Sequence, residues 1–92
     1  MQIWKYPLTP RTRQVIAMPE GAVILSTDVK NTVMRIWAMV DPRKPTTDRV
    51  IEVFPTGYDI PADMGVERKF IGSCIVKEWG ISLVFHIFER MN

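Results

Sequence analysis

The chain has 92 residues, a length that allows one domain with a thin core. Its hydrophobic content of 47% and aromatic content of 10% exclude a disordered chain, and a net charge of +2 excludes bulk attraction to a phosphate backbone as the main mode of binding. Cys74 is the only cysteine, which excludes an intramolecular disulfide and is typical of proteins in a reducing compartment.

Proline and glycine divide the chain into short runs rich in β-branched and aromatic residues, which favour strands. The predicted strands are residues 2–8, 13–18, 22–29, 33–40, 49–54, 69–77 and 81–89. In the third of these runs, Val23, Leu25, Thr27 and Val29 alternate with the other residues and are predicted to share one side of a strand.

The connections between these strands are predicted from their turn-forming residues. Residues 30–32 and 78–80 are short enough for tight turns, so two β-hairpins are expected. Residues 41–48 contain two prolines and no apolar residue, which indicates an exposed loop. The longest irregular segment is 55–67, where residues 60–64 are compatible with one helical turn.

Short strands at intervals of roughly ten residues are typical of sandwiches and small barrels. We therefore predict a single β domain over residues 1–92, all-β and mainly antiparallel. Its expected architecture is a small sandwich or partly open barrel of about six to seven strands. At most one short helical turn is expected.

Several motifs resemble a family of small uncharacterised phage and prophage proteins, and they occur in the same order along nearly the whole chain. The motifs are Ile3-Trp4-Lys5-Tyr6, the run from Ala17 to Leu25, the run from Ile36 to Asp41, Thr56-Gly57-Tyr58, Phe70-Ile71-Gly72 and the run from Leu83 to Glu89. The resemblance implies a phage origin and a compact β domain, but no established activity. Relatives often carry histidine where this chain has Tyr58, which weakens a catalytic interpretation.

His86 and Cys74 are the residues that a catalytic interpretation would use. Alternation places His86 on the strand face of Val84 and Phe88, where it is a general base or ligand contact in one interpretation and a structural histidine in the other. Alternation alone does not decide whether Cys74 shares that face, and a buried thiol is the simpler interpretation. We therefore assign no catalytic residue.

No metal or cofactor site is predicted. One histidine and one cysteine supply too few of the usual zinc ligands. Asp59, Asp63 and Glu67 share the long loop, but they lack the dense oxygen ligands and glycine placement of a calcium loop.

Aromatic and arginine residues give the strongest indication of binding. Trp37 is predicted to share a strand face with Arg35, and an arginine beside an indole can stack on a planar ring while pairing with a phosphate. Arg49 and Arg68 border the two long loops. The alternative is that these aromatic residues fill the core. The candidate ligand-binding residues are Arg35, Trp37, Arg49, Tyr58 and His86.

These observations predict a binding protein rather than an enzyme. We expect a phage-encoded protein that counters host defence in the cytosol of the host cell, by sequestering a small nucleotide-like signal or by capping a host protein. A homo-oligomer is expected, because a core this thin gains from a subunit interface. The alternatives are a small hydrolase that uses His86 and a weak binder of single-stranded nucleic acid, although the basic residues do not cluster. No membrane association is expected.

Overall fold

The computed structural model describes residues 1–62 and 64–91, and its regular structure is entirely β. The strands are β1 (Gln2–Pro7), β2 (Arg13–Pro19), β3 (Val23–Lys30), β4 (Val33–Val40), β5 (Thr46–Pro55), β6 (Arg68–Glu78) and β7 (Ile81–Arg90). This confirms the predicted all-β class and each of the predicted strands. In the described part of the chain, no helix is present that is long and apolar enough to cross a membrane.

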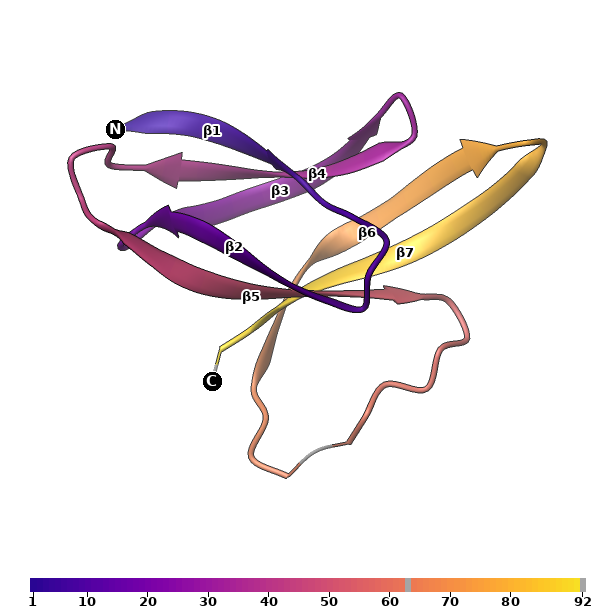
Figure 1. Ribbon diagram of the computed structural model, residues 1–92. Helices are drawn as coiled ribbons and strands as arrows, with labels where there is room; N and C mark the ends of the chain where they lie inside the picture. The colour runs from indigo at the N-terminus through magenta and orange to yellow at the C-terminus, as the bar shows by residue number, and fades with distance from the viewer. Residues whose placement is uncertain (63, 92) are drawn as a thin grey trace.

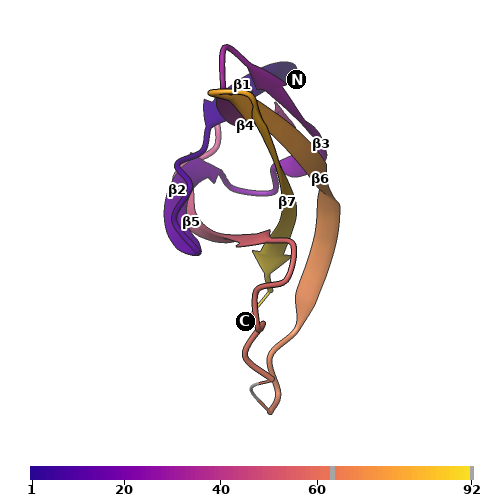
Figure 2. The ribbon, with the colours of Figure 1, turned by 90° about the vertical axis from the view of Figure 1, so that its right-hand side faces the viewer.

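The strands form two antiparallel sheets that face each other (Figures 1 and 2). We call the three-stranded sheet, in the order β1-β4-β3, sheet A, and the four-stranded sheet, in the order β2-β5-β7-β6, sheet B. The chain enters sheet A, crosses to sheet B through β2, returns for the β3–β4 hairpin and ends in sheet B. The two sheets do not close into a barrel, so the sandwich is the correct one of the two expected architectures.

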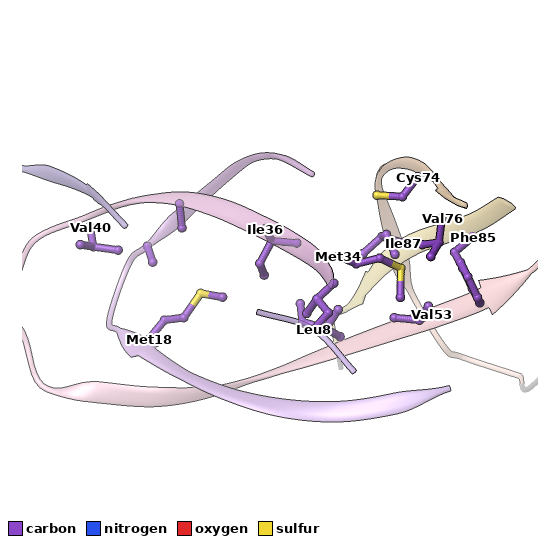
Figure 3. Packing of buried hydrophobic residues seen from close by; sticks show 13 residues of the cluster. Leu8, Met18, Met34, Ile36, Val40, Val53, Cys74, Val76, Phe85 and Ile87 are labelled. Carbon is purple, nitrogen blue, oxygen red and sulfur yellow. The ribbon is translucent and has the colours of Figure 1, made fainter. Parts of the chain in front are cut away.

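The core lies between the two sheets. It is formed by every second side chain along each strand, because successive side chains point to opposite faces of a sheet. On β4, Met34, Ile36, Ala38 and Val40 are buried, while the residues between them are exposed or only half-buried. Figure 3 shows these side chains meeting those of sheet B. The sheet B members of this cluster are Met18, Ile51, Val53, Cys74, Val76, Phe85 and Ile87.

A β-bulge in β3 corrects the predicted alternation of that strand. The register with β4 shifts between Ile24 and Ser26, so Leu25 is an extra residue. Val23 pairs with Met39 on the outer face of sheet A, whereas Thr27 and Val29 lie on the inner face. The prediction that Val23 shares a side with Thr27 and Val29 is therefore wrong, because one inserted residue reverses the side on which every preceding residue points.

The sandwich is narrowest where β3 packs against β6. A Cβ atom on Gly72 would lie 2.8 Å from Cγ2 of Thr27, so only glycine allows this approach. A second bulge, between Phe70 and Gly72, bends β6 at the same place. The two sheets are thus held together along one edge by close backbone packing.

Both predicted tight turns are two-residue hairpin loops with positive φ at each position. Asn31 and Thr32 have φ of 50° and 64°, and Trp79 and Gly80 have φ of 54° and 73°. This is the conformation of a type I′ turn, which matches the twist of the flanking strands. Asparagine and glycine adopt it readily, whereas for tryptophan the left-handed conformation costs about 1 kcal/mol.

Two predictions about the loops differ from what the structure shows. The exposed loop expected over residues 41–48 is shorter, because Thr46, Thr47 and Asp48 pair with the end of β2 and belong to β5. The helical turn expected over 60–64 includes Asp63, which lies outside the described residues, and no helix is present in the rest of that segment.

Candidate functional site

The five candidate residues from the sequence lie in three separate places. Arg35 and Trp37 lie on the outer face of sheet A, and Arg49 lies at one end of the interface between the sheets. Tyr58 and His86 lie together at the end of sheet B from which the long loop projects. No single pocket therefore combines all five.

Arg35 and Trp37 share a face, as predicted, but Arg35 already has an anionic partner. Its guanidinium lies 5.0 Å from the centroid of the Trp37 ring and donates two hydrogen bonds of 2.8 Å to the carboxylate of Asp28. The Arg35 hydrogen bonds, with a smaller contribution from the Trp37 indole, lower the pKa of Asp28, and Asp28 in turn raises the pKa of Arg35. A phosphate would therefore compete with Asp28 for the charge of Arg35.

Arg49 forms part of the framework between the sheets. It is paired with the carboxylate of Glu89 on the neighbouring strand β7 and donates a 2.8 Å hydrogen bond to the carbonyl of Ala22. Both side chains are largely buried, and the hydrogen bonds with Glu89 raise the pKa of Arg49. This arrangement ties β5 and β7 to the turn between β2 and β3.

The outer face of sheet B carries a chain of contacting aromatic rings. Tyr58 stacks on Phe54 with a centroid separation of 5.6 Å and an interplanar angle of 21°. Phe88 contacts Phe54 at 6.0 Å and Phe70 at 5.2 Å. Phe54 is buried beneath its neighbours, whereas Tyr58 is 47% exposed. The exposed part of Tyr58 therefore offers a supported aromatic surface at the start of the long loop.

His86 lies beside Phe54 in the β5–β7 pairing, and both of its ring nitrogens contact hydroxyl groups. Its Nε2 is 2.8 Å from Oγ1 of Thr56, and its Nδ1 is 2.8 Å from Oγ of Ser73. Each hydroxyl can donate or accept in its contact with the ring, so both contacts are compatible with hydrogen bonding. The result is a row of three polar side chains next to the aromatic rings.

A charged cluster lies on the other side of Phe54. The carboxylate of Glu52 is buried, accepts a 2.7 Å hydrogen bond from Arg68 and lies 3.7 Å from Arg13. Arg68 also contacts the Phe54 ring and donates a hydrogen bond to the carbonyl of Pro61 in the long loop. The side chain of Arg13 is 56% exposed, so it is the cation of this cluster that solvent or a ligand reaches most easily.

A groove of about 240 Å³ connects the aromatic and charged groups. It is lined by Thr12, Arg13, Glu52, Phe54, Tyr58 and Pro61. Its volume is somewhat below the usual range for drug-sized ligands and suits a single planar ring. We call this groove, with the adjoining row of Thr56, His86 and Ser73, the Tyr58 site.

Cys74 does not belong to this site. It pairs with Phe85 on the inner face of sheet B, opposite the face that carries His86, and its Sγ lies 3.1 Å from Oγ1 of Thr27. The thiol is buried in the core, where it also donates a hydrogen bond of 3.7 Å to the carbonyl of Asp28, and its position answers the question that alternation left open. Among residues 1–62 and 64–91, no group of three or more metal-ligating side chains comes together, and Asp63 of the predicted loop acids lies outside that part.

Sequence reasoning missed the groups that complete the Tyr58 site. The pairing of Ser73 with His86 can be counted from the two-residue turn at Trp79-Gly80, because that turn fixes the register of the hairpin as far as the bulge at Gly72. The contributions of Thr56, Phe54 and Glu52 depend on pairing between distant strands, which a single sequence does not reveal.

The fold and the site define a two-sheet β-sandwich with an aromatic, partly charged groove on the outer face of its larger sheet. A model of a protein family, described as a domain of unknown function (DUF7352), matches residues 1–92, so the chain belongs to this family. No curated protein and no solved structure matches the chain.

Proposed function

We propose that this protein is a binding protein that holds a small nucleotide-like molecule at the Tyr58 site. The observation that carries the proposal is the half-exposed Tyr58 ring, stacked on the buried Phe54 and flanked by Arg13. A planar heterocycle gains about 1–3 kcal/mol from stacking on an aromatic side chain. Arg13 is placed to pair with a phosphate attached to that ring.

The rigidity of the site also favours recognition. Phe54 is held by Phe88 and by Arg68, and Arg68 is held by the buried carboxylate of Glu52. A ligand would therefore meet a preorganised surface and lose little binding energy in ordering it. The hydroxyls of Thr56 and Ser73 add hydrogen-bonding groups that suit the edge of a base or a ribose.

The resemblance to small phage proteins suggests a biological role for such binding. We propose that the protein sequesters a nucleotide-like signal of host defence in the cytosol of the infected cell. Sequestration requires tight binding without chemical change of the ligand, which agrees with a site built from stacking and hydrogen-bonding groups.

A second candidate function is hydrolysis, because Ser73 lies within hydrogen-bond reach of His86, as a nucleophile and its base do. The third group in this row is the hydroxyl of Thr56, where Ser-His-Asp triads have a carboxylate. Replacing that carboxylate by a neutral group reduces kcat by about 10⁴-fold in a serine protease. We therefore prefer binding over catalysis.

The experiment that tests the proposal is recovery of a bound ligand. The purified chain is incubated with a cyclic dinucleotide or with ADP-ribose, separated from free ligand and then heated, and the released molecule is identified by mass spectrometry. Binding followed by intact release is expected, both for the natural chain and for Ser73→Ala. A chemically altered product that disappears with Ser73→Ala would instead establish the hydrolase, and no retained ligand would refute the nucleotide proposal.

A further inference from the structure

The tip of the β6–β7 hairpin carries an exposed tryptophan in an unfavourable backbone conformation. The side chain of Trp79 is 91% exposed, and its φ of 54° lies in the left-handed region. At this turn position asparagine or glycine forms the same hairpin without strain. Trp79 combines this backbone conformation with an almost fully exposed aromatic ring, so it is a candidate contact residue.

An apolar cleft lies next to this tip, between the two hairpins. Both hairpins end on the same side of the molecule (Figure 1), and residues of both line one cleft. The cleft between them has a volume of about 350 Å³ and is lined mainly by apolar side chains, with the carboxylate-bearing Glu78 among its polar groups. The apolar lining consists of Leu8, Pro10, Val33, Met34, Val76, Leu83 and Phe85.

We propose that Trp79 of one molecule inserts into this cleft of a second copy, and that the second copy does the same in return, to form a symmetric dimer. A twofold interface uses the same patch on both subunits, so it requires a projection and a matching cavity close together on one chain. Trp79 and the cleft meet this requirement. Glu78 is placed to accept the indole N–H, which needs a partner when the ring is buried.

The surface area of the chain supports a second copy as the occupant. The accessible surface is 6152 Å², whereas a compact monomer of 10.6 kDa is expected to expose about 5,500 Å². This excess of about 700 Å² is summed over the whole chain, including the projecting loop between β5 and β6 (Figure 1), and it is of the same order as the roughly 800 Å² that each partner buries in a standard interface. Ile81 and Leu83, which are 59% and 49% exposed, extend the apolar surface beside Trp79.

The test is self-association of the full chain, measured by sedimentation velocity over a range of concentrations. We expect the natural chain to shift from 10.6 kDa to twice that mass as its concentration rises. Trp79→Asn should weaken the association about 1,000-fold, because the symmetric dimer loses two buried tryptophans, each worth about 2 kcal/mol. Because asparagine suits the turn, the same variant should melt about 4 °C higher than the natural chain at a concentration where both are monomers.

Two further variants make the test specific. Leu83→Glu removes the apolar lining of the cleft but keeps Trp79, so it should also remain monomeric, whereas its mixture with Trp79→Asn should form a heterodimer through one intact contact. Ile3→Ser removes a side chain that is 60% exposed on another face, and it should dimerise normally.

A natural chain that stays monomeric at every concentration would overturn the proposal, as would a Trp79→Asn variant that dimerises like the natural chain. If the monomeric chain instead shows a Trp79-dependent fluorescence shift with phosphatidylcholine vesicles, the tip contacts lipid and the dimer is refuted. These results do not depend on the Tyr58 site, which lies on the outer face of sheet B.

Discussion

The outer faces of the two sheets both combine an arginine with aromatic rings, but the arginines differ in what remains available to a ligand. On sheet A, Arg35 covers Trp37 and is paired with Asp28 through two hydrogen bonds. On sheet B, Arg68 takes the corresponding structural role with Glu52, and this leaves Arg13 and the Tyr58 ring exposed. The comparison teaches that residues on one face of a strand can be predicted to lie close together. Whether an arginine among them is available to a ligand depends on the position of the nearest carboxylate.

The largest expected difference between the two faces is in stability. Glu52→Ala should lower the free energy of unfolding by about 3 kcal/mol, because it removes a buried carboxylate that pairs with both Arg68 and Arg13. Asp28→Ala should have a much smaller effect, since Asp28 is 44% exposed and water replaces the lost carboxylate. Urea denaturation of both variants measures this difference, and equal losses would contradict it.

The smallest expected effect is the pH dependence that the Arg35–Asp28 pair gives to sheet A. The hydrogen bonds from Arg35 lower the pKa of Asp28 below the ordinary aspartate value of about 4. The contribution of this pair to stability is therefore complete above pH 4 and is lost as the pH falls through the lowered pKa of the folded state.

The indole N–H signal of Trp37 in an NMR titration reports on this pair, because the ring lies against Arg35. We expect a transition with a midpoint below pH 4 that is absent in Asp28→Asn. A midpoint at or above the ordinary value would show that Arg35 does not stabilise the charged form of Asp28.

Most of the fold was predictable because proline, glycine and turn residues separate short runs that are rich in β-branched and aromatic residues. The run from Val33 to Val40 is apolar on both faces apart from Arg35, and the structure confirms the predicted strand. Leu25 could not be recognised as an extra residue, since a bulge leaves no pattern in a strand that is apolar on both faces. Thr46 and Thr47 resembled a loop because they are polar, and they belong to β5 only through pairing with the distant β2.

The site was less predictable, for a physical reason. Register within a hairpin is local, so the two-residue turn at Trp79-Gly80 already places Ser73 opposite His86 and Cys74 on the other face. The stacking of Tyr58 on Phe54 and the pairing of Glu52 with Arg68 depend on how the long loop returns to sheet B. That path is set by tertiary packing, which no local pattern encodes.

Binding measurements on a matched pair of variants test the central claim most directly. Tyr58→Ala removes the exposed ring from sheet B, and Trp37→Ala removes the arginine-covered ring from sheet A. If the Tyr58 site binds the nucleotide-like ligand, calorimetric titration with ADP-ribose or a cyclic dinucleotide should show an affinity about tenfold weaker for Tyr58→Ala and unchanged for Trp37→Ala. A loss of affinity in Trp37→Ala with full binding by Tyr58→Ala would contradict the account.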